Sequence, residues 1–138
     1  MIGIVIVTHS RLGEALIEAA ELIVGGPPEA ATAVSIDLTQ NVDRLRQKIA
    51  DGIRRVRSAD GVLILTDMFG GTPSNLSYSF LEEGRVEVLS GVNLPMVIKA
   101  LNARTKQPLP DLAALLEVYG KKSISLASSI LKGNKRTG

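Results

Sequence analysis

Apolar residues occur along this chain in two alternating patterns, short apolar runs and stretches with helical spacing. The short runs contain many β-branched residues and lie at 2–7, 33–38, 61–66 and 86–90. Such runs are typical of strands, and the most apolar of them predict strands buried on both faces. Apolar residues spaced three or four positions apart predict helices at 12–23, 42–56, 76–81, 95–103 and 112–119.

The alternation of strands and helices predicts the fold class. Consecutive strand–helix–strand units form right-handed crossovers, which give a mostly parallel sheet with helices on both faces. We therefore expect an α/β protein, an open three-layer sandwich with a four-stranded sheet in the order 2-1-3-4. The segment SISLASSIL at 123–131 fits either a strand or a helix. We expect one domain over 1–133 and a disordered tail over 134–138.

Composition narrows the range of functions. The chain has 138 residues, 45% of them hydrophobic, so one core can form without crosslinks. The absence of cysteine and the single histidine exclude thiolate sites and a multi-histidine zinc site within one chain, and we expect no metal or cofactor. A net charge of +2 and only four aromatic residues argue against nucleic acid as a partner. We find no apolar run of membrane-spanning length and no leader pattern, which predicts a cytoplasmic protein without direct membrane insertion.

The histidine stands where the first strand ends, at Thr8-His9-Ser10, and Ser10 could cap the following helix. Asp67 comes directly after the third strand. Strand order reverses between strands 1 and 3, and neighbouring strands lie about 4.8 Å apart, so these two side chains can touch. A carboxylate that accepts from one imidazole nitrogen fixes the tautomer and leaves the other nitrogen free as a nucleophile. Each residue alone also fits a structural role, as a strand-end histidine or a capping aspartate, but the pair favours a catalytic site.

A glycine-rich turn follows Asp67 and leads into the next predicted helix. Its backbone N–H groups would point toward the same place, and glycine lets the backbone approach a ligand closely. We therefore predict a phosphate cradle, to which Thr8 could add a hydroxyl. Its candidate residues are Thr8, Gly70, Gly71, Thr72, Ser74 and Asn75. The turn is neither a Walker loop nor a dinucleotide fingerprint, and it could also serve only as a tight turn.

Three segments together give the chain a family resemblance. They are IVIVTHS at 4–10, DMFGGTPSN at 67–75 and SGVNLPM at 90–96. With them, nearly the whole chain resembles the enzyme IIA domain of the mannose-class sugar phosphotransferase system. The resemblance implies that His9 is phosphorylated and that Asp67 orients it, and it also implies the 2-1-3-4 sheet.

The same resemblance implies the partners. The phosphoryl donor would be the phosphohistidine of the carrier HPr, and the acceptor a histidine of a IIB protein. Membrane IIC and IID components could associate with the complex. The family implies a homodimer in which a C-terminal antiparallel strand is exchanged, and 123–131 could be that strand.

Several other protein classes share part of this pattern. The phosphotransfer subunit of dihydroxyacetone kinase shares the fold, but its second motif matches less well. A response-regulator receiver would need an acidic pair after the first strand, where this chain has Thr8-His9. A hydrolase would need a G-x-S-x-G elbow, which the sequence lacks. A purely regulatory, phosphorylation-dependent binding protein would need the same histidine as a sugar transporter component, and the sequence leaves that choice open.

Overall fold

The four strands form one parallel sheet. The computed structural model describes the backbone of residues 1–137 and the side chains of residues 1–132. The strands are β1 (Gly3–His9), β2 (Ala31–Ile36), β3 (Val62–Thr66) and β4 (Val86–Ser90). Their order, β2-β1-β3-β4, confirms the predicted topology.

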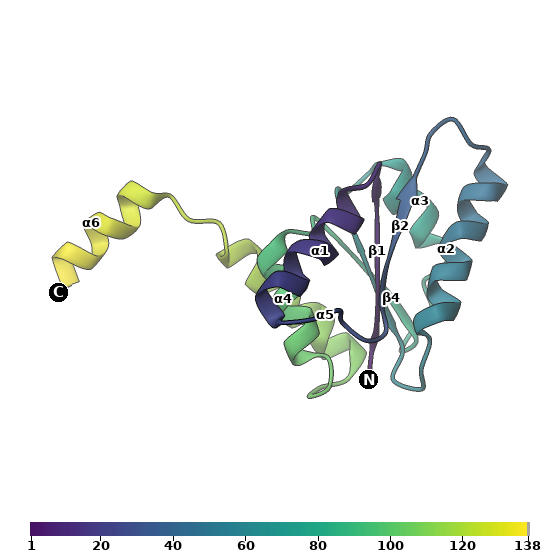
Figure 1. The fold of residues 1–138 in the computed structure, drawn as a ribbon. Helices are drawn as coiled ribbons and strands as arrows, with labels where there is room; N and C mark the ends of the chain where they lie inside the picture. Colours follow the sequence, from purple (N-terminus) through teal and green to yellow (C-terminus); the bar gives the residue numbers. More distant parts are fainter. Residues whose placement is uncertain (138) are drawn as a thin grey trace.

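Helices cover both faces of this sheet, as the alternation predicts (Figure 1). Their bounds are α1 (Leu12–Val24), α2 (Val42–Val56), α3 (Thr72–Tyr78), α4 (Leu94–Ala103), α5 (Leu109–Lys122) and α6 (Ala127–Thr137). Successive residues of a strand point to opposite faces. Ile4 and Ile6 therefore join a core with α1, α4 and α5, whereas Val5 and Val7 join a second core with α2 and α3. Both faces of β1 are buried, which explains its continuous apolar run.

The register brings the ends of the two central strands together. Val7 of β1 pairs with Thr66 of β3, so His9 and Asp67 follow at the same edge of the sheet. The start of α1 differs from the prediction. Ser10 has a φ of 51° and is not the cap; Arg11 is the N-cap residue and makes no capping side-chain bond.

Helix α5 is longer than predicted and passes through Gly120 to Lys122. The apolar spacing predicted a helix that ends at 119, directly before Gly120. Instead its missing side chain allows close packing, because a Cβ at that position would lie 2.5 Å from the Met96 Cε atom. Contact between α4 and α5 therefore explains this glycine.

The C-terminal segment leaves the body of the protein as an arm (Figure 1). Residues 127–137 form helix α6, so of the two readings of 123–131 this chain adopts the helical one over 127–131. The helix extends over 134–137, and Gly138 lies outside the described residues. The disordered tail expected over 134–138, the strand exchange and the domain boundary at 133 stay predictions. Across the described residues, no helix combines the length and apolarity needed to cross a membrane.

Candidate active site

His9 and Asp67 are in direct contact at the carboxyl edge of the sheet. The Nδ1 atom of His9 lies 2.8 Å from the Asp67 Oδ2 atom. The same Oδ2 atom accepts the backbone N–H of His9 at 2.9 Å, so one carboxylate oxygen fixes both the ring and the backbone. The carboxylate can only accept at this ring contact, which places the proton on Nδ1 and leaves the Nε2 lone pair free. The predicted pairing of these two residues is therefore present.

The environment of Asp67 keeps it ionised. Burial raises the pKa of its carboxyl, but the hydrogen bonds and charge of His9 together outweigh burial, so the pKa is lowered. Its Oδ1 atom also accepts the backbone N–H of Met68 at 3.0 Å. The Asp67 side chain is 11% exposed, whereas that of His9 is 36% exposed. The anion is thus sheltered while the imidazole remains accessible.

Gly71 borders the free edge of the imidazole. A Cβ built at this position would lie 2.8 Å from the His9 Cε1 atom and 3.5 Å from Nε2. Its φ of −85° is open to any residue, so close approach to the ring, and not backbone conformation, requires glycine here. Gly70 differs, because its φ of +87° lies in the left-handed region that favours glycine. The two glycines therefore have separate physical roles.

Two further candidate residues, Thr72 and Asn75, lie beside the glycine turn. Thr72 begins α3 and is half-buried. Asn75 braces the turn, because its backbone N–H donates to the Gly71 carbonyl at 2.9 Å and its side-chain Nδ2 donates to the Gly70 carbonyl at 3.4 Å. Both residues thus stay near the turn that faces His9.

Two predicted hydroxyls lie elsewhere. Thr8 is fully buried, and its Oγ1 atom accepts the backbone N–H of Gly13, where α1 begins. Ser74 is also fully buried, and its hydroxyl donates to the Met68 carbonyl. Neither hydroxyl faces the free side of the imidazole, so both support the site from within the fold. Hydroxyl groups beside a glycine-rich turn suggested contacts with a phosphate. In the structure the hydroxyls of Thr8 and Ser74 instead bond to backbone groups of the protein.

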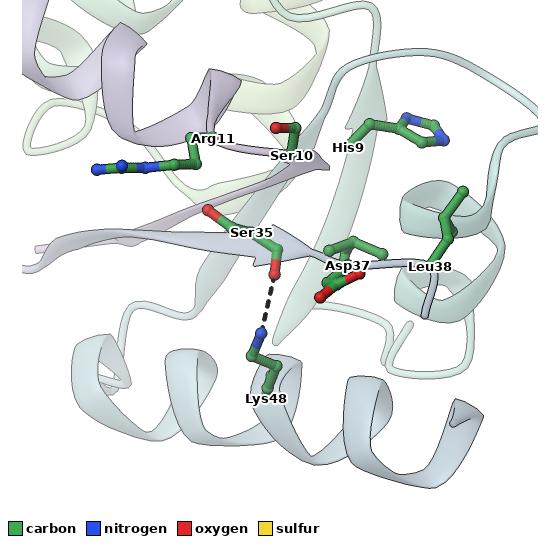
Figure 2. Close-up of a pocket in the computed structure, with 8 residues that line it drawn as sticks. His9, Ser10, Arg11, Ser35, Asp37, Leu38 and Lys48 are labelled. Atoms are coloured by element: carbon green, nitrogen blue, oxygen red, sulfur yellow. Dashed lines mark hydrogen bonds between the residues drawn. The ribbon is translucent and has the colours of Figure 1, made fainter. Parts of the chain in front are cut away.

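A cavity of about 530 Å³ opens on the other side of His9. Figure 2 shows residues from the ends of β1 and β2 around it, together with Lys48 from α2. The Nζ atom of Lys48 donates to the Ser35 carbonyl at 3.1 Å and to the Gln40 Oε1 atom at 3.2 Å. No sequence motif marks Lys48 or its neighbour in the cavity, Leu38, and neither is among the predicted site residues. For Leu38 the available signal was its position at the end of the second predicted strand, whereas Lys48 lies within α2.

Comparison with known proteins gives the family. A family model for the mannose-type EIIA family, described as the phosphotransferase system (PTS) fructose IIA component, matches residues 3–117. The chain belongs to this family. The resemblance predicted from three short segments is therefore confirmed, and as a PTS IIA component the chain is a phosphotransferase that carries phosphoryl groups for sugar uptake.

Individual relatives of this IIA domain agree with that result. It is 31% identical over 133 residues to the fructose-specific EIIA component of Bacillus subtilis, covering 96% of this chain and 90% of that protein. It is 33% identical over 127 residues to the mannose-specific EIIAB component of Escherichia coli K12, covering 89% of this chain but only 38% of that longer protein.

Solved structures show the same fold. The EIIA structure from Streptococcus agalactiae has a TM-score of 0.83 and 27% identity, covering 94% of this chain and 99% of that chain. The mannose/sorbose IIA subunit from Enterococcus faecalis has a TM-score of 0.80 and 25% identity, covering 91% of this chain and 93% of that chain.

Proposed function

We propose that this IIA domain carries its phosphoryl group on the Nε2 atom of His9. The observation that supports this most directly is the bond between Nδ1 and Asp67, which leaves Nε2 as the nucleophilic nitrogen. The ring is also partly exposed, so another protein can reach it. Asp67 is the orienting residue, and its negative charge stabilises the positive charge that the ring gains when Nε2 bonds to phosphorus.

The proposed donor is the phosphohistidine of HPr, and the proposed acceptor is a histidine of a IIB protein. In the first transfer the Nε2 lone pair attacks phosphorus in line with the leaving nitrogen of HPr. The new bond joins Nε2 to phosphorus while the donor nitrogen–phosphorus bond breaks and its electron pair returns to the donor imidazole. The proton on Nδ1 stays in place. The second transfer repeats these steps with His9 as the donor.

The glycine turn is proposed to hold the phosphoryl oxygens. Gly71 approaches the Nε2 side of the ring more closely than any residue with a Cβ could. Backbone N–H groups at Gly70, Gly71 and Thr72, with the Thr72 hydroxyl, are the proposed donors, and Asn75 holds the turn in shape. Helix α3 has only seven residues, so the proposal depends on this close approach and not on a helix dipole.

Exposed apolar side chains around His9 form a proposed docking rim for HPr and IIB. Phe69 is 80% exposed and stands beside Tyr78, with ring centroids 6.1 Å apart. Met68 and Leu38 are exposed as well. Apolar contacts around a central reactive group are typical of protein interfaces. The exposed apolar side chains of this rim therefore favour a protein over a free small molecule as the phosphoryl donor.

The test is transfer from phosphoenolpyruvate through enzyme I and HPr. We expect an acid-labile, base-stable adduct on His9, and nuclear magnetic resonance (NMR) should place the phosphorus on Nε2. The variant His9→Gln should remain folded and unlabelled. Full labelling of that variant would contradict the assignment, and an adduct on Nδ1 would contradict the proposed role of Asp67.

A further inference from the structure

Four hydroxyl groups gather beside the turn that holds Asp67 and Gly71. They belong to Thr66 at the end of β3, Ser74 and Tyr78 in α3, and Ser90 at the end of β4. Ser74 Oγ lies 2.5 Å from Thr66 Oγ1 and 3.1 Å from Ser90 Oγ. Ser90 Oγ also lies 2.8 Å from Thr66 Oγ1 and 3.2 Å from the Tyr78 hydroxyl oxygen. The hydroxyl cluster thus links two strands and one helix.

The direction of donation in this cluster follows from counting protons. A carbonyl oxygen can only accept, so the single proton of the Ser74 hydroxyl goes to the Met68 carbonyl. Thr66 donates its one proton to Ser90 Oγ, so Ser74 Oγ can accept the proton of Ser90. Tyr78 in turn can donate to Ser90, which gives a chain of donors that ends at Met68. Hydroxyls in such a chain polarise one another, which strengthens each hydrogen bond. Ser74 and Thr66 are also fully buried, so water cannot replace a hydrogen bond that is lost.

Met68 transmits this arrangement to His9. Its carbonyl accepts from Ser74, while its N–H donates to the Asp67 Oδ1 atom at 3.0 Å. The other oxygen of the same carboxylate, Oδ2, holds the imidazole at 2.8 Å. The path from the cluster to the reactive ring therefore consists of one backbone residue and one carboxylate.

We propose that the hydroxyl cluster is a positioning element for phosphotransfer, which sets the orientation of the Asp67 carboxylate and through it the tautomer and direction of His9. This inference rests on the proposed function of His9. Ser74 is its central residue, because its proton is the one that reaches the Met68 carbonyl. None of the four hydroxyls touches the phosphoryl group in this proposal.

The test compares two serines of the same helix. Ser74→Ala removes the donor to Met68, whereas the matched control Ser77→Ala removes an equally buried hydroxyl that donates to the Pro73 carbonyl at 2.6 Å. Ser77→Ala loses one buried hydrogen bond, whereas Ser74→Ala also loses the contacts to Thr66 and Ser90 and should lose more stability. The readouts are therefore ones that a loss of stability alone would not change. The first readout is the ring ¹⁵N spectrum of His9 in the unphosphorylated protein, which reports the Nδ1–H tautomer. The second is the maximal rate of transfer from phospho-HPr, measured separately from the half-saturating HPr concentration.

We expect Ser74→Ala to reduce the Nδ1–H tautomer and to lower the maximal rate roughly tenfold, the equivalent of one buried hydrogen bond, with little change in half-saturation. Ser77→Ala should match the wild type in both. Equal behaviour of the two variants would overturn the proposal. If Ser74→Ala fails to fold, Tyr78→Phe decides, because a smaller shift in the same direction is expected and an unchanged tautomer would overturn it. Failure of the wild type to phosphorylate His9 would refute the proposed function, while the ring spectra would still test the positioning.

Discussion

Replacing Gly71 with alanine tests the geometry of the site most sharply. The added Cβ would lie 2.8 Å from the His9 Cε1 atom, and the ring would have to move about 0.6 Å to reach an ordinary contact of 3.4 Å. Such a shift would disturb the 2.8 Å bond between Nδ1 and Asp67. Because misplacement of a reacting group by about 1 Å can cost 10²-fold in rate, we expect transfer to slow by roughly ten- to a hundredfold.

Stability should change little in this variant, because the φ of −85° at Gly71 suits alanine. The assay is the rate of phosphoryl transfer from phospho-HPr, read beside the thermal midpoint of unfolding. Gly26→Ala is the matched control, since a Cβ there meets no atom of the described residues within 4 Å. A Gly71→Ala variant that transfers at the wild-type rate would refute the close approach as a functional requirement.

Two further predictions concern the carboxylate and the arm. Asp67→Asn should fold but transfer slowly, because the amide lacks the negative charge that orients and stabilises the ring. Since the folded pKa of Asp67 is lowered, its stabilisation is complete above the unfolded value of about 3.9 and is lost as the pH falls through the folded value. Denaturant titrations should therefore show a smaller loss of unfolding free energy in acid for Asp67→Asn than for the wild type; an equal loss would contradict this. We also expect a homodimer in which the arm, with exposed Ile124 and Leu126, docks on the partner subunit. Truncation after Ser123, which keeps α5 whole, should give a monomer in sedimentation equilibrium, and a stable truncated dimer would exclude that role.

The sequence alone determined the sheet and the pair of residues at the ends of its two central strands. Strands buried on both faces have no polar alternation, so β1 and β3 were visible as apolar runs. Crossover handedness then restricts the topology, and the ends of two neighbouring parallel strands must meet. His9 and Asp67 could therefore be paired without coordinates, because local pattern and topology together decide their distance.

Tertiary structure alone decided what each neighbouring residue does. Sequence placed Thr8, Ser74 and Gly71 in the same cradle, yet two are buried supports and only Gly71 lies against the ring. Gly120 looked like a helix end but is a contact between α4 and α5. These roles depend on side-chain direction and on distances between elements that are remote in sequence. Composition and periodicity describe neither, since they reveal which face a residue occupies but not which atom it meets there.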